Sequence, residues 1–189
     1  MSATDDLKNL ILFELGVDNV TDFTSNDPLV LKVNQVYSVM IESLLSIYRW
    51  SFAVKSVELT GDALTDERYK YSFDLPEDYL RTENVFDNVK ETFSIGDYRI
   101  IENKIHCNKE KIYLRYVFKA SEESFPSYFV EVCKFKGAYD LCYNLTGDTD
   151  KQQILQQQFT FFYINAKNVD SRQFGSKTIK SKPYTDIRG

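Results

Sequence analysis

The chain has 189 residues, of which 43% are apolar, and it contains 14 Phe and 13 Tyr. This length suits one compact domain, or one domain with an insertion, and the apolar content is sufficient to form a buried core. With only 7 Gly and 4 Pro, the composition excludes a low-complexity or linker-dominated protein. The formal net charge of −5 gives no reason to expect tight nucleic-acid binding by the body as a whole.

The charge is unevenly distributed along the chain. From Ser171 to Gly189 five basic residues face a single acidic one, Asp186, so this segment carries +4 and the first 170 residues carry −9. A basic tail on an acidic body predicts that the tail docks on another surface. The alternative interpretation is a solubilising, disordered terminus.

The cysteines and the N-terminal residues indicate in which cellular compartment the protein is made. There are three cysteines, in no CxxC spacing, which is typical of structural thiols in a reducing compartment. The polar, acidic N-terminus lacks the pattern of a signal peptide, and no apolar run reaches the ~18 residues of a membrane span. We therefore expect a soluble protein that is intracellular when it is made and has no contact with a membrane.

Two helices are predicted at the start of the chain. The first covers about Thr4–Leu15, with Ser2 or Thr4 as its N-cap and Gly16 as its stop. The second begins at Pro28 behind a cap at Asn26 or Asp27 and ends near Trp50. Its apolar stripe is wide, which indicates packing partners on more than one side.

The period of the apolar residues then changes to that of strands. Short runs joined by tight turns predict an antiparallel meander, and Pro76 interrupts it because proline has no N–H to donate. The expected strands are 52–59, 69–73, a short strand within 85–93, 98–102, 104–107 and 111–118.

Two more helices are predicted after the strands. Phe125-Pro126 opens one that runs to about Asn144, and Asp148 or Asp150 caps another from about Lys151 to Arg172. The last helix carries a glutamine-rich run over 152–158, which suits either a solvated face or a contact between subunits. Its predicted apolar stripe consists of Ile154, Leu155, Phe159, Phe162, Tyr163, Ala166 and Val169.

The order of elements predicts an α+β fold. We expect a four-helix bundle, formed by residues 1–51 and 125–172, with an antiparallel β-rich domain (52–124) inserted between the second and third helices. Residues 173–189 are expected to form an extended basic C-terminal arm.

Candidate residues for chemistry are few. His106 and Cys107 are neighbours in a strand and so point to opposite faces, while Cys133 and Cys142 are too far apart on one helix to pair. No glycine-rich phosphate loop is present. The sequence therefore predicts no catalytic, cofactor-binding or metal-binding residue, although a two-carboxylate hydrolase stays open as an alternative.

The aromatic residues of the strand region allow two interpretations. They are a stacking platform for single-stranded nucleic acid or, because the nearby lysines are balanced by acids, residues of a packed core. The five aromatic residues concerned are Tyr69, Tyr71, Phe73, Tyr113 and Tyr116.

Several motifs, in a fixed order over about 180 residues, resemble those of the head-to-tail adaptor family of short-tailed phages (podoviruses), also called tail tubular protein A. The second helix closes on Arg49-Trp50-Ser51-Phe52, and an Ile-Tyr-Leu-Arg-Tyr strand (112–116) is soon followed by Phe125-Pro126. The chain ends on Arg188-Gly189. The central motif comprises Leu75, Pro76, Glu77, Asp78, Tyr79 and Leu80.

The resemblance implies a structural, non-enzymatic virion protein without cofactors. Its copies, commonly twelve, would form a ring between the portal protein and the tail nozzle, or tubular protein, around the channel through which DNA is ejected. An acidic channel wall would let DNA pass without sequence-specific binding. The residues expected to bind the portal are Lys177, Lys180, Lys182, Pro183, Tyr184 and Arg188. The alternatives are another ring or collar protein of a phage, or a small monomeric interaction module.

Overall fold

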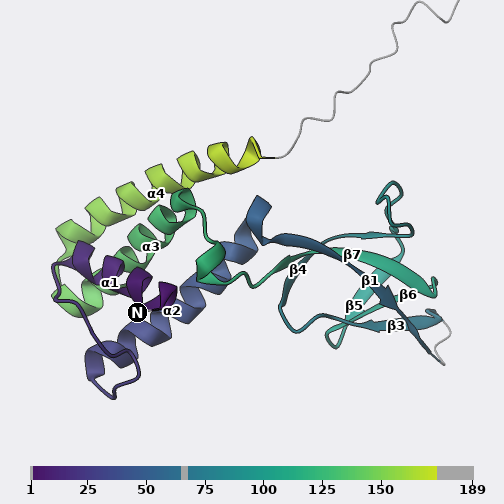
Figure 1. The fold of residues 1–189 in the computed structure, drawn as a ribbon, viewed down its shortest axis with the longest axis horizontal. Coiled ribbons are helices and arrows are strands. Elements are labelled where there is room, and N and C mark those ends of the chain that lie inside the picture. The colour runs from purple at the N-terminus through teal and green to yellow at the C-terminus, as the bar shows by residue number, and fades with distance from the viewer. Residues whose placement is uncertain (1, 65–67, 174–189) are drawn as a thin grey trace, which may run out of the picture.

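The computed structural model describes residues 2–64 and 68–173. Within these ranges the chain is α+β, as predicted, with four α-helices and two antiparallel sheets. All the strands lie between the second and third helices in chain order. Figure 1 shows an elongated molecule, with the helices gathered at one end and the strands at the other.

The first two helices are α1 (Ala3–Leu15) and α2 (Pro28–Ile47). The Ser2 hydroxyl accepts a hydrogen bond from the Asp5 N–H, and Gly16 ends α1 with a left-handed φ of 70°. The Asp27 carboxylate accepts from the Leu29 N–H at 2.7 Å and caps α2. α2 ends at Ile47, directly before the Tyr48-Arg49-Trp50 stretch where its end was expected, and Tyr48 has an extended backbone.

A 3-10 turn at Ser51–Ala53 leads into the strands. The strands are β1 (Val54–Thr60), β2 (Asp62–Ala63), β3 (Tyr71–Asp74), β4 (Tyr79–Phe86), β5 (Tyr98–Ile101), β6 (Lys104–Cys107) and β7 (Lys111–Phe118). They form two sheets, with the orders β1-β7-β4 and β2-β3-β6-β5.

The prediction of a simple meander is wrong, although all the pairings are antiparallel. The central strand of the first sheet is β7, which pairs along its length with β1, from Val54 opposite Val117 to Thr60 opposite Lys111. These are the two strands that connect the sheets to the helices. Their pairing brings together residues about 60 positions apart in sequence. The local spacing of apolar residues cannot reveal a pairing over such a distance.

The predicted strand within 85–93 is also wrong. β4 starts earlier, at Tyr79, and ends at Phe86, and the chain then turns. Glu91 adopts a left-handed φ of 51°, which a strand does not accommodate. The loop returns to the sheet at residues 93–95, where Ser94 forms an isolated bridge to Phe86 and the Ile95 N–H donates to the Val85 carbonyl at 2.7 Å.

The last two helices are α3 (Ser127–Thr146) and α4 (Thr149–Ser171). Between them Gly147 has a φ of 68°, and the Asp148 carboxylate caps α4 by accepting from the Lys151 N–H at 2.9 Å. The 3-10 turn Glu122–Ser124 precedes α3. The helix α3 is central, because α1, α2 and α4 all pack against it.

The buried apolar residues fall into two clusters. One contains residues of all four helices, together with Trp50, Ala53 and Val117. The other lies among the strands and includes Phe73, Leu114 and Tyr116. Strand β7 contributes to both clusters, and the half-buried Phe118 packs against both.

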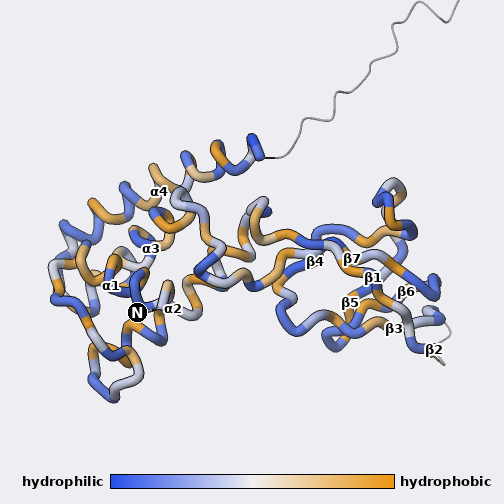
Figure 2. The backbone as a smooth tube through the Cα atoms, in the orientation of Figure 1, coloured by the Kyte–Doolittle hydropathy of each residue, from blue (hydrophilic) through white to orange (hydrophobic). Residues whose placement is uncertain are grey.

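The predicted apolar stripe of α4 is only partly buried. Leu155 and Ala166 are buried, but Ile154 is 58% exposed and Val169 is 41% exposed. In Figure 2 apolar and polar segments alternate along α4, which lies on the outside of the helical end. No helix among the described residues is both long and apolar enough to cross a membrane.

Candidate functional site

The junction between helices and strands is organised around Trp50, a residue of the family-like motifs. The indole is fully buried, and its Nε1 donates to the Leu44 carbonyl at 2.8 Å, which satisfies an acceptor in the last turn of α2. The ring packs against aromatic residues from α3, from α4 and from the segment between α2 and β1: Tyr48, Phe52, Tyr128, Phe129 and Tyr163. The end of α2 is thereby held at the junction.

A buried carboxylate completes the junction. Asp170, near the end of α4, is fully buried and accepts hydrogen bonds from the Ser51 N–H at 3.0 Å, from the Ser51 hydroxyl at 2.7 Å and from the Tyr128 hydroxyl at 2.7 Å. Burial, followed by the hydrogen bond to Asp170, raises the pKa of Tyr128 to about 12. One side chain therefore joins α4, α3 and the segment that enters β1.

The Leu75–Tyr79 motif forms the loop between β3 and β4. The Tyr79 N–H donates to the Pro76 carbonyl at 3.0 Å and closes a tight turn. The Asp78 carboxylate accepts from the Tyr116 hydroxyl at 3.0 Å and pairs with Lys55. Burial acts to raise the pKa of Asp78, but the hydrogen bonds from Lys55 and Tyr116 outweigh it, so the pKa is lowered.

The other motif side chains also have packing or surface positions. Leu75 packs against the strand cluster, whereas Glu77 is exposed. The motif therefore fastens the loop onto β1 and β7, and its side chains are engaged in structural contacts.

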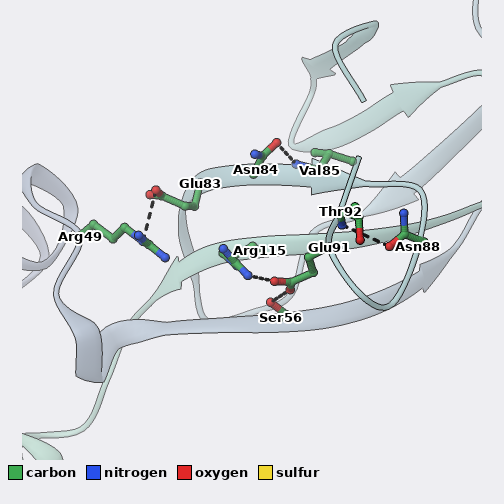
Figure 3. Close-up of polar contacts among 9 residues, drawn as sticks. All are labelled: Arg49, Ser56, Glu83, Asn84, Val85, Asn88, Glu91, Thr92 and Arg115. Carbon is green, nitrogen blue, oxygen red and sulfur yellow. Dashed lines mark hydrogen bonds and ion pairs between the residues drawn. The ribbon is translucent and has the colours of Figure 1, made fainter. Parts of the chain in front are cut away.

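A group of ion pairs covers the sheet near the junction (Figure 3). Glu83 of β4 lies 3.3 Å from Arg49 and 3.5 Å from Arg81. Glu91 reaches back from the 87–95 loop to Arg115 of β7 and to Ser56 of β1. Burial and the nearby Arg49 lower the pKa of Arg115. The acids and bases here are paired with each other, and they tie the loop to the sheet.

The histidine and cysteine side chains that were candidates for catalysis or metal binding do not converge on one site. His106 and Cys107 point to opposite faces of β6, and the Tyr69 ring meets the His106 ring edge-on at 6.4 Å. All three cysteines are buried free thiols, in agreement with the prediction of structural thiols. Among the described residues, no group of three His, Cys, Asp or Glu side chains is placed to hold a metal ion.

The aromatic residues of the strands mostly form core. Tyr69, Phe73 and Tyr116 are at most 2% exposed, so their faces are not available for base stacking. The Tyr113 hydroxyl donates to Glu58 at 2.7 Å. These positions favour the packed-core interpretation over the stacking platform.

Two surfaces of the helical part are exposed and apolar. Along α4, Ile154, Phe161 and Ile164 are 58%, 61% and 54% exposed, and Gln153, Gln156, Gln157 and Gln158 surround them. Between α2 and α3 lies a groove of about 590 Å³. Its lining includes Val36, Val39, Met40 and Leu141. The sequence did not point to this groove, because it requires knowing which helices are neighbours.

The residues expected to bind the portal, from Lys177 to Arg188, lie outside the described residues. Asp170 and its partners were missed in the sequence. A signal was present, since Asp170 follows Ala166 by four residues and Tyr163 by seven, on the face of the helix that is buried. An acidic residue at such a position indicates a buried polar contact.

Neither a family model nor a curated protein matches this chain.

Proposed function

We propose that this chain is a structural subunit of a phage ring, the head-to-tail adaptor that joins the portal of a short-tailed phage to its tail nozzle, and that it has no enzymatic activity. The proposal includes the domain arrangement: a four-helix bundle made from both ends of the chain, with the strands as an insertion. The observation that carries it is the single hydrophobic cluster to which all four helices contribute, while α2 and α4 keep exposed apolar surface. Such a rigid body with unpartnered faces suits a unit of a closed assembly.

The charge of the chain supports the same proposal. Residues 1–170 carry −9, and a ring of acidic subunits repels the phosphate backbone and lets DNA slide through its channel. We propose that the basic segment after Asp170 pairs with an acidic surface of the portal. The hydrogen bonds of Asp170 support separate roles for the acidic body and the basic segment, because they fix the end of α4, after which the segment begins.

The test is assembly with the portal protein of the same phage. The intact chain is mixed with portal rings and examined by electron microscopy and light scattering, in parallel with a variant that lacks 174–189 but keeps Asp170. We expect a second ring on the portal with the intact chain only, and unchanged circular dichroism for the shortened chain. Docking of the shortened chain with equal affinity contradicts the role of the arm, and no ring with either chain contradicts the adaptor function.

A further inference from the structure

The exposed face of α4 lacks charge over an unusual length. Between Lys151 and Lys167 there is no charged residue, although this stretch is the outer helix of the molecule. Ile154, Phe161 and Ile164 are spaced by seven and three residues, so they lie on one face. We call this surface the α4 ridge. Depletion of charge together with exposed aromatic and aliphatic residues is typical of the core of an interface.

The groove between α2 and α3 offers a matching surface. Val36, Val39 and Met40 of α2 and Leu141 of α3 supply its apolar lining. The exposed Lys32 also lines it, and its two other charged residues, Lys136 and Asp140, form an ion pair with each other. An uncharged helix face placed there leaves neither of these two charges without its partner, whereas a charged face would compete for them.

We infer that the α4 ridge of one copy packs into the α2–α3 groove of the next copy. The inference rests on the proposed ring and names the contact that builds it. None of Ile154, Phe161 and Ile164 lines the groove, and all three are exposed, so a copy does not cover its own groove with its own ridge. In Figure 1 the helices α2 and α4 lie on either side of α3. A contact between two different surfaces is heterologous, and it builds a ring when the rotation from copy to copy closes, as the proposed function requires.

The size of the ridge favours a ring over a stable pair. The uncharged stretch between Lys151 and Lys167 has 15 residues and is about 23 Å long, so a strip ~10 Å wide along it covers on the order of 200 Å². This is less than the ~800 Å² per partner of a typical stable interface. A single contact is therefore weak, but every copy in a closed ring makes two contacts, so assembly is expected to be cooperative and strongly concentration-dependent.

The first test uses charged substitutions and mixing. Phe161→Glu blocks the ridge and Val39→Glu blocks the groove, and either one alone is expected to weaken self-association at least about tenfold. The matched controls are Phe93→Glu and Val89→Glu, at positions 67% and 70% exposed in the strand part, which leave association unchanged. When the two blocked variants are mixed, one free ridge meets one free groove. Because a single contact is weak, the mixture is examined at high protein concentration, where sedimentation velocity should show pairs and nothing larger.

The second test traps the contact directly. Chains carrying Val39→Cys and Phe161→Cys are mixed at high concentration and oxidised, and a cross-link between them is expected. Val89→Cys mixed with Phe161→Cys is the control and should give no cross-link between the two chains, because Val89 lies outside the groove. The native cysteines are buried and should not contribute cross-links in either mixture.

The outcomes separate the contact from the ring. Rings in the microscope without the Val39–Phe161 cross-link, or rings that both charged variants still form, overturn the ridge-and-groove contact and leave the adaptor function standing. If Val39→Glu has no effect on self-association while Phe161→Glu weakens it, the ridge pairs with a second ridge. This outcome also overturns the ridge-and-groove contact. If the cross-link forms but no ring appears even on the portal, the contact stands and the adaptor function fails.

Discussion

At the scale of single residues, the junction depends on a few buried polar contacts. Asp170 receives three hydrogen bonds from Ser51 and Tyr128, and Trp50 donates one to Leu44. Trp50 is recognisable in the sequence as a large apolar residue at the end of a helix. The partners of Asp170 are not, because Ser51 lies more than a hundred positions away and only the fold brings the two together.

Removing the buried carboxylate is expected to destabilise the whole protein. Asp170→Ala removes the acceptor of the half-buried Ser51 N–H and of the Ser51 and Tyr128 hydroxyls, which should cost about 2 kcal/mol in the free energy of unfolding. The exposed Asn168→Ala on the same helix is the control and should change it by less than ~0.5 kcal/mol. Urea unfolding followed by the fluorescence of Trp50, the one tryptophan, measures both variants. Equal stability of the two would show that the carboxylate is dispensable.

At the scale of elements, the caps and stops were the most predictable features. Asp27 with Pro28 begins α2, and Gly16 and Gly147 end helices with left-handed backbones, because each residue has a local reason to be there. The burial of α4 was harder to predict. Its sequence offers apolar residues on more than one face, and only packing against α3 decides that Leu155 is covered and Ile154 is not.

The packing of α1 on α3 predicts the effect of a small substitution. A Cβ at Gly137 would lie 2.4 Å from the Cδ1 of Ile11, which is itself 1% exposed, so the helices must move apart to admit it. We expect Gly137→Ala to lower the free energy of unfolding by about 1–3 kcal/mol. Gly96→Ala is the matched control, since a Cβ there meets nothing within 4 Å. Circular dichroism during thermal unfolding compares them, and an unchanged midpoint for Gly137→Ala would contradict the close approach.

At the scale of the whole molecule, the two clusters of buried residues are connected through a shared strand, β7. Strand β7 carries Leu114 and Tyr116 in the strand cluster and Val117 in the helical cluster, and it pairs with the neighbouring strands β1 and β4. The mixed α+β class followed from the changes in apolar period along the chain. The pairing of β1 with β7, which joins the two parts, did not, because strands that pair over a long loop leave no local trace.

This continuity predicts one cooperative unfolding transition. Leu114→Ala creates a cavity in the strand cluster and should cost about 3 kcal/mol. Because the clusters share β7, we expect the transition of Trp50 fluorescence, which reports on the helical cluster, to shift by the same amount as the far-ultraviolet signal. A fluorescence transition that stays at its original denaturant concentration while the dichroism shifts would mean that the two parts unfold independently.

The position of Asp170 has a mechanical consequence. Any pull on the chain beyond residue 173 is passed to the last turn of α4, and from there through a carboxylate to Ser51 at the entrance of β1 and to Tyr128 at the start of α3. The load is thus shared by three segments at once: α4, the start of α3 and the entrance of β1.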